Sequence, residues 1–210
     1  MQNIPIIILY VIVNLSILVV LCEVKTINEL NVMLILEKIQ HFSDKKSAIY
    51  LISLLFIFIL SGILPSKWKE IIIFWKIKNR LPGCYAFSKY AKEDNRVDLE
   101  LLESNYGNIL TLSPKEQNRL WYKIYKNIND AGIENTHKNF LLSREIAVIN
   151  FVSLILIIPF LFINYNCIFM FLCLLFEFII FRIIAKNYAE RLITNVLAYE
   201  SSRLHIKAQK

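Results

Sequence analysis

One acidic residue, Glu177, lies in the middle of a long apolar run and is the strongest candidate for chemistry in the chain. An ionisable side chain inside a bilayer costs on the order of a few kcal/mol unless it is paired, protonated or hydrated. Two interpretations stay open: a carboxylate that lines or gates a pore, and a structural hydrogen bond between helices to Asn14, Asn150 or Ser153. Arg182 follows near the end of the same run, where its side chain can reach the interface. The candidate pore or gating residues are Glu177, Asn150, Asn14 and Arg182.

Basic and aromatic side chains are mixed in two polar segments, and this mixture is typical of surfaces that bind anions. The candidate residues for an anionic ligand are Lys76, Lys78, Arg80, Arg119, Lys123, Lys126, Trp121 and Tyr122. Such side chains on a helix can grip phosphates and stack on bases. Each segment also has a structural interpretation. The first could be an interfacial helix, with tryptophan at headgroup level and lysine on anionic lipid, and the second could pack a small core and solvate its edge.

Signals of enzymes, metal sites and cofactor sites are absent from the sequence. No Walker loop, GxGxxG, HExxH or nucleophile elbow occurs, and the four cysteines lack CxxC spacing. Asp94, Asp98 and Glu100 cluster near Arg96 and could hold Mg²⁺, but metal centres need convergent ligands, so we favour a solvated helix start. His137 is interpreted as a structural residue. We predict that the protein is not an enzyme and has no cofactor.

The elements that must position these residues are four apolar runs, each long enough to cross a bilayer. Hydrophobic residues make up 56% of the 210 residues, and the mean hydropathy is +0.49, which is too apolar for one soluble core of this length. The runs are 4–22, 48–64, 146–163 and 167–185. A spanning helix needs about 20 mainly apolar residues. We predict an all-α membrane protein with two transmembrane helices followed by a C-terminal hairpin of two more.

The orientation follows from lysine and arginine near the spans, because these residues mark the cytoplasmic side. Residues 66–145 hold 14 Lys and Arg against 10 Asp and Glu, residues 186–210 form a basic tail, and residues 23–47 hold four of each charge. The insert 66–145 and the tail are therefore predicted to be cytoplasmic, with both termini inside. Residues 23–47 form the outer loop, which contains an amphipathic helix. The predicted location is the inner membrane of a bacterium.

The first run also allows another interpretation, a signal peptide. No positive charge precedes it and no small-x-small cleavage site follows it, so we keep 4–22 as a span.

The cytoplasmic insert is predicted to be helical. An amphipathic helix follows Pro65 and is stopped at 81–83, and the spacing of Val97, Leu101 and Tyr106 indicates a short helix. Ser113, with Pro114 next and Glu116 three residues on, is a capping signature. That helix is predicted to break at Gly132, after which one continuous helix runs into the third span.

The tail keeps helical spacing of apolar residues after the fourth span. The stripe consists of Tyr188, Leu192, Val196, Tyr199 and Ile206. Such a stripe is close to a coiled-coil seam and favours contact between subunits. Packing back onto the cytoplasmic insert is the alternative.

The stretches LPGCYAFSKYAKEDNRVD and SPKEQNRLWYKIYK lie in an insert between two spans and a two-span hairpin. This layout resembles the small four-helix membrane effectors of bacterial anti-phage systems, which sit beside enzymes that produce nucleotide signals. The resemblance implies a homo-oligomer in the lipid bilayer whose cytoplasmic domains bind a cyclic nucleotide or an oligonucleotide. It also implies that the spans open a damaging pore on infection.

Two functional hypotheses remain after these observations. The first is a ligand-gated membrane effector or ion-conducting pore, whose cytoplasmic partner could be a nucleotide-signal synthase or its product. The second is a non-conducting scaffold that recruits a cytoplasmic enzyme or sensor. A small transporter is disfavoured, because the spans lack the Gly- and Pro-broken helices expected at a midplane substrate site.

Overall fold

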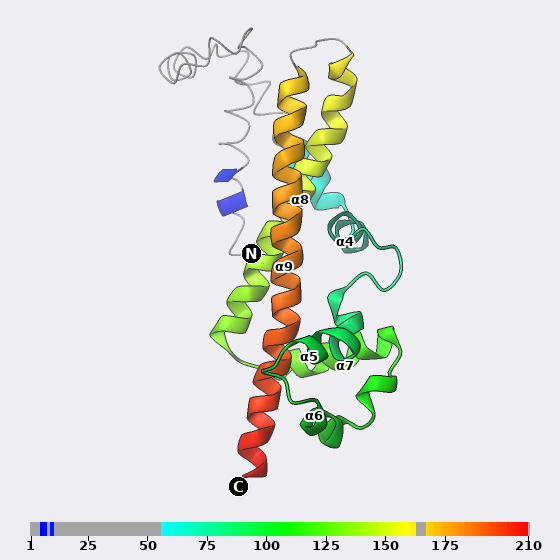
Figure 1. Cartoon of the computed structure of the whole chain (residues 1–210). Coiled ribbons are helices and arrows are strands. Elements are labelled where there is room, and N and C mark those ends of the chain that lie inside the picture. The colour runs from blue at the N-terminus through cyan, green and yellow to red at the C-terminus, as the bar shows by residue number, and fades with distance from the viewer. Residues whose placement is uncertain (1–4, 8, 11–55, 163–166, 210) are drawn as a thin grey trace. The chain divides into compact units, whose positions relative to one another are not determined.

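The computed structural model describes residues 5–7, 9–10, 56–162 and 167–209, and the secondary structure in this part of the chain is helical (Figure 1). Residues 56–63 are helical, and the elements after them are α4 (Ser66–Phe74), η2 (Pro82–Tyr85), η3 (Ala86–Tyr90), α5 (Ala91–Glu93), α6 (Leu99–Tyr106), η4 (Ile109–Thr111), α7 (Pro114–Lys126), α8 (Ala131–Leu161) and α9 (Cys167–Ala208). The predicted all-α class is confirmed for these residues. The outer loop 23–47, most of the first predicted span and part of the second lie outside the described residues.

The chain divides into two compact units. Unit 1 comprises residues 1–69 and 142–182, and unit 2 comprises residues 70–141 and 183–210. Helices α8 and α9 each contribute residues to both units. The prediction of one continuous helix from the insert into the third span is confirmed by α8.

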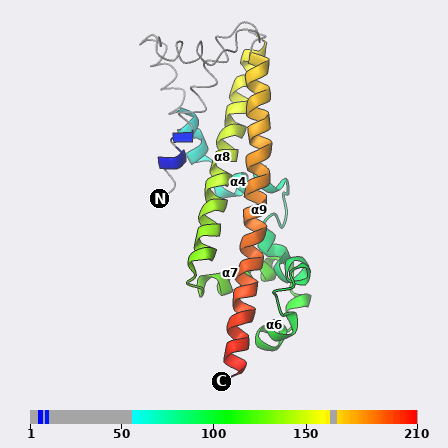
Figure 2. The same ribbon diagram turned by 60° about the vertical axis from the view of Figure 1, so that its left-hand side comes forward.

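Unit 1 contains the apolar parts of α8 and α9, which lie side by side and antiparallel (Figure 2). The rings of Phe151 and Phe178 meet there with centroids 5.5 Å apart. Two helices, over Ala131–Pro159 and Ile168–Ala208, are long and apolar enough to cross a membrane. Half of the most apolar stretch of α8, but only 17% of that of α9, is buried within the protein. The outer surface of α9 therefore needs an apolar solvent or partner.

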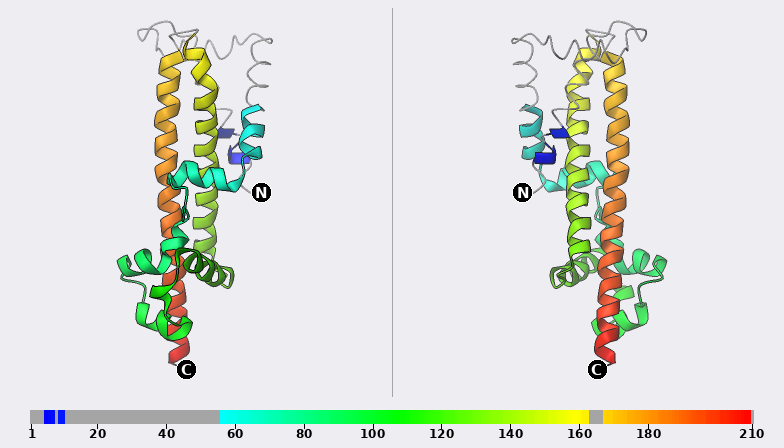
Figure 3. Two further views of the ribbon diagram at one scale, coloured as in Figure 1. Left: turned by 90° about the vertical axis from the view of Figure 1, so that its right-hand side faces the viewer. Right: turned by 90° about the vertical axis from the view of Figure 1, so that its left-hand side faces the viewer.

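Unit 2 packs its short helices against the C-terminal part of α9 (Figure 3). The insert contributes apolar side chains such as Phe87, Leu102 and Ile124 to one core, and α9 contributes Val196 and Leu197. All five side chains are at most 2% exposed. Burial of this apolar surface is the main term that stabilises unit 2.

The tail stripe is divided between this core and the surface. Leu192 and Val196 are buried against the insert, whereas Tyr199 and Ile206 are exposed. The buried residues of the stripe therefore pack onto the insert, which is the alternative interpretation given above.

Helix α7 begins with the predicted capping box. The Glu116 carboxylate accepts hydrogen bonds from the Ser113 amide at 2.9 Å and from the Ser113 hydroxyl at 2.6 Å. These hydrogen bonds hold the pKa of Glu116 below its usual value. Because the local hydrogen bonds close within four residues, the sequence alone suffices to locate this helix start.

Two predicted helix boundaries are wrong. Helix α4 ends at Phe74 rather than at 81–83, because Trp75 has a left-handed backbone with φ of 52°. Gly132 does not break a helix but lies inside the first turn of α8. The break lies before it, and the Asp130 carboxylate caps α8 by accepting the Ile133 amide at 2.9 Å.

A buried glutamine joins α7 to the preceding elements and provides a test of the fold. The side-chain oxygen of Gln117 accepts the amides of Phe87 and Ser88 at 3.2 and 3.1 Å, and its nitrogen donates to the Leu112 carbonyl at 3.0 Å. Gln117→Ala leaves these groups without their partner and should lower the free energy of unfolding by about 3 kcal/mol. Hydrogen exchange at the Phe87 and Ser88 amides should accelerate accordingly.

Arg119→Ala on the exposed side of the same helix is the control and should change stability by less than about 0.5 kcal/mol. Equal protection of the two amides in Gln117→Ala and in the wild type would contradict the assigned role of Gln117.

Candidate functional site

Three polar side chains meet in unit 1. The Tyr10 hydroxyl lies 2.5 Å from Glu177 Oε2, and Asn150 Nδ2 lies 2.9 Å from the same hydroxyl and 3.4 Å from Glu177 Oε2. The single phenolic proton can serve either Glu177 or Asn150 Oδ1, which is 3.1 Å away. The shorter contact to a carboxylate is the stronger one, so Tyr10 donates to Glu177 and accepts from Asn150.

The cluster joins three helical segments that are far apart in the sequence. Tyr10 comes from the first predicted span, Asn150 from α8 and Glu177 from α9. Asn150 is only 2% exposed, and a buried amide is costly unless it is hydrogen-bonded. The rings of Tyr10 and Phe181 also pack edge to face, with centroids 5.4 Å apart. The arrangement therefore satisfies polar groups within an apolar unit.

The structure places the other predicted gating residues differently. Asn14 lies outside the described residues. Arg182 is half-buried on α9, five residues after Glu177, and Ser153 donates to the Ile149 carbonyl of its own helix at 2.9 Å. Tyr10 was missed by the sequence analysis, although a tyrosine within an apolar run needs a partner for its hydroxyl.

Helix α7 carries a basic face. Lys115, Arg119, Tyr122 and Lys126 follow the spacing i, i+4, i+7 and i+11 and share one side of the helix, with Lys123 beside them. All five side chains are exposed. The Lys126 ammonium lies 5.5 Å from the centre of the Tyr122 ring. This surface, which we call the α7 basic face, combines four positive charges with an aromatic ring and matches a ligand that carries phosphates.

Trp121 does not belong to the α7 basic face, which corrects its assignment as a ligand residue. It lies on the opposite side of α7, is 8% exposed and forms part of the core of unit 2. Its ring stacks on Tyr125, with centroids 5.6 Å apart and planes 4° apart. The sequence analysis grouped Trp121 with Tyr122, but only the Tyr122 ring is accessible to a ligand.

The basic residues after α4 are held by contacts of their own. The Arg80 guanidinium lies 2.5 Å from Glu70 Oε2, and the Lys76 ammonium lies 4.6 Å from the centre of the Tyr85 ring. Lys78 is exposed. Since Arg80 is paired with a carboxylate, this segment offers less positive charge to a ligand than its composition suggests.

The carboxylates near Arg96 have structural contacts, an ion pair for Asp94 and a helix cap for Asp98. Asp94 forms a bidentate ion pair with Arg96, with a shortest distance of 2.7 Å, and this hydrogen-bonded pair lowers the pKa of Asp94. Asp98 caps α6 by accepting the Leu101 amide at 3.0 Å. Among the described residues, no group of three or more His, Cys, Asp or Glu side chains could hold a metal ion.

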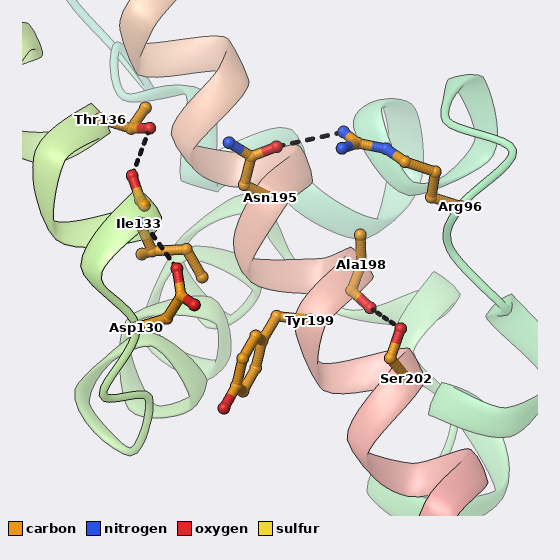
Figure 4. A pocket seen from close by; sticks show the side chains of 9 residues that line it. Arg96, Asp130, Ile133, Thr136, Asn195, Ala198, Tyr199 and Ser202 are labelled. Carbon is orange, nitrogen blue, oxygen red and sulfur yellow. Dashed lines mark hydrogen bonds between the residues drawn. The ribbon is translucent and has the colours of Figure 1, made fainter.

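A surface pocket in unit 2 was not identified from the sequence (Figure 4). It has a volume of about 580 Å³ and is lined by Arg96, Asp130, Gly132, Ile133, Thr136, Asn195, Ala198, Tyr199 and Ser202. The first turns of α8 form one side and α9 forms the other. Its size suits a small polar molecule. Asp94 neutralises Arg96 and Asp130 adds a negative charge, so the pocket suits phosphates less well than the α7 basic face does.

Buried hydrogen bonds fasten the insert to α9. The Tyr106 hydroxyl donates to Glu200 Oε1 at 2.6 Å, and the same oxygen accepts from Arg203 at 2.7 Å. Glu200 is fully buried. The burial of Tyr106 and its contact with the Glu200 carboxylate raise the pKa of Tyr106 to about 12. A second phenol, Tyr90, donates to Glu190 at 3.0 Å, and burial together with that carboxylate raises its pKa.

His137 has a structural contact. Its Nδ1 lies 2.8 Å from the Tyr125 hydroxyl, and the two rings pack edge to face. This contact lies between α7 and the start of α8 and agrees with the structural interpretation of the histidine.

The polar cluster of unit 1 predicts an energetic coupling between Tyr10 and Glu177. In a double-mutant cycle of Tyr10→Phe and Glu177→Gln, the coupling should be about 1 kcal/mol, because polar contacts in membranes contribute about this much. This coupling free energy is measured by unfolding each variant with dodecyl sulfate, starting from the folded protein in detergent micelles. Ser153→Ala, whose hydroxyl bonds its own helix, should be additive with Tyr10→Phe. Additivity of the Tyr10 and Glu177 substitutions would contradict the observed contact.

The buried phenol predicts a pH dependence. Because the pKa of Tyr106 is raised from 10.0 to about 12 on folding, its stabilising effect is complete below about pH 10 and is lost as the pH rises through about 12. The difference in tyrosinate absorbance between the wild type and Tyr106→Phe gives this pKa. Glu200→Gln should lower it, since the charge that disfavours the phenolate is removed. A midpoint near 10 in the folded wild type would be inconsistent with this contact.

No protein-family model, no curated protein and no solved structure matches this chain.

Proposed function

We propose that the protein is an oligomeric membrane effector, with four transmembrane helices and both termini in the bacterial cytoplasm, in which a nucleotide or oligonucleotide bound to unit 2 changes the state of the spans. The observation that carries the proposal is that α8 and α9 each supply residues to unit 2 and continue into an apolar stretch long enough to cross a membrane. A ligand that alters these helices in unit 2 acts on the same helices that enter the membrane.

The α7 basic face is the proposed binding surface. Its side chains recur about every four residues along α7, which corresponds to about 6 Å of helix and suits successive phosphates of an oligonucleotide. Tyr122 is 50% exposed and offers a ring for a base. The supporting contacts are on the other face of α7, where Gln117, Trp121 and Ile124 are buried and hold the helix in place.

Coupling from α7 to α9 passes through the core of unit 2. Trp121 and Ile124 share this core with Leu192, Val196 and Leu197 of α9. A ligand can shift the equilibrium between two states of α9 only if it binds one state more tightly. Close packing between α7 and α9 would supply this difference, since a shift of one helix is transmitted to the other.

Glu177 is the proposed element that responds within the membrane. In the structure it accepts from Tyr10 and lies close to Asn150, so this arrangement represents a closed or resting state in the proposal. Movement of α9 relative to α8 would separate these groups and expose the carboxylate to a pore. The outcome would be depolarisation of the membrane, as the layout of anti-phage effectors implies.

The second candidate function is a membrane scaffold that recruits a cytoplasmic partner. The observation that favours it is the same cluster, because a carboxylate held by two polar side chains can be purely structural. A scaffold would use the α7 basic face for an acidic protein surface and would not conduct ions.

Membrane potential, followed with a voltage-sensitive dye in cells that express the chain during phage challenge, separates the two functions. The wild type should depolarise the cells, and Glu177→Ala should abolish the effect at equal membrane levels. Arg119→Glu combined with Lys123→Glu should weaken the response at least about tenfold, because two charge-assisted contacts to the ligand are lost.

Lys92→Glu combined with Lys207→Glu is the matched control, since it makes the same charge change at two exposed lysines away from α7. An unchanged potential for the wild type under every condition, with a partner protein that copurifies, would support the scaffold instead. A response to the control pair equal to that of the α7 pair would remove α7 from the proposal.

A further inference from the structure

The segment 75–80, which follows α4, contains two large apolar side chains that are mostly exposed. Trp75 is 67% exposed and Ile77 is 76% exposed. Lys76 and Lys78, which alternate with them, are also exposed. We call this segment the 75–80 loop. Exposed side chains of this size in a cluster indicate a surface that contacts another apolar phase or partner.

The 75–80 loop is held in a defined conformation. Trp75 and Asn79 both have left-handed backbones, with φ of 52° and 47°, which is uncommon for residues other than glycine. The Arg80 side chain bonds the Glu70 carboxylate and also donates to the Ile77 carbonyl at 3.3 Å. Strain of this kind persists only where the surrounding contacts impose it. The contacts of Arg80 and the backbone angles thus hold Trp75 and Ile77 in a defined, exposed position.

We infer that the 75–80 loop inserts Trp75 and Ile77 into the headgroup region of the bilayer, with Lys76 and Lys78 on the phosphates of anionic phospholipid. The inference rests on the proposed transmembrane topology. In that topology the second span ends at residue 64, and the loop follows after a single helix, α4, of nine residues, which is about 14 Å long. The loop therefore cannot lie far from the membrane surface.

The chemistry of the loop fits a lipid surface better than a protein partner. Tryptophan prefers the depth of the headgroups, and lysine reaches from there to lipid phosphates. A protein interface usually needs about 800 Å² from each partner, and two apolar side chains provide only a fraction of that area. The alternation of Trp75 and Ile77 with two lysines instead matches a thin apolar layer edged by negative charge.

Fluorescence quenching by brominated lipids in nanodiscs tests the inference on the full-length chain. The three tryptophans are Trp68, Trp75 and Trp121. Trp68→Phe serves as the background, and Trp68→Phe with Trp75→Phe serves as the blank, so that Trp121 contributes equally to both. With phosphatidylglycerol present and bromine near the headgroup, the Trp75 signal should fall roughly twofold. Lys78→Glu should lower the ratio of inserted to free loop by about fivefold.

Two reporters on the same background separate the possible failures. Tyr122→Trp places a tryptophan on α7 and should stay accessible to acrylamide and unaffected by brominated lipid. Phe176→Trp, at an exposed position of α9, should be quenched by bromine deep in the acyl chains. If Phe176→Trp is quenched but Trp75 behaves like Tyr122→Trp, the loop inference is overturned and the topology stands. If Phe176→Trp is not quenched, the membrane topology itself is wrong.

Discussion

The long apolar surface of α9 is the constraint that governs the described part of the structure, because little of this surface is covered. Only 17% of the most apolar stretch of α9 is covered by the protein, and side chains such as Leu172 and Phe176 remain exposed. In water this surface would drive association or aggregation. A bilayer would remove this cost, whereas unit 2 buries its apolar side chains in a core of its own.

The constraint makes the few polar groups in unit 1 important. A hydrogen bond among Tyr10, Asn150 and Glu177 adds little to the free energy of folding, but an unsatisfied carboxylate at that position would be costly. The cluster thus acts mainly by specifying which helices meet. Separating the helices would break the contacts of Glu177 with Tyr10 and Asn150.

Unit 2 uses its polar side chains in a different way. Glu200 is fully buried, yet it accepts from Tyr106 and Arg203, and Gln117 supports two backbone amides of η3. These bonds define a single arrangement of short helices around α9, which apolar packing alone would leave degenerate. These polar contacts add to the apolar core of unit 2 that α7 and α9 share.

The sequence by itself determined the helical class, the long apolar helices and the capping box at Ser113, because these features depend on local hydrogen bonds and on the periodicity of apolar residues. It also placed Asn150, with Asn14 and Ser153, among the candidate hydrogen-bond partners of Glu177, without selecting one of the three. Only the tertiary structure decided that Tyr10 joins them, that Trp121 faces the core and that Trp75 faces outward. Asn150 and Tyr10 are separated by 140 residues. Trp75 lies outside α4 because its backbone is left-handed, with φ of 52°. Neither outcome follows from local pattern, since packing between distant segments selects among faces and turns that the sequence leaves equivalent.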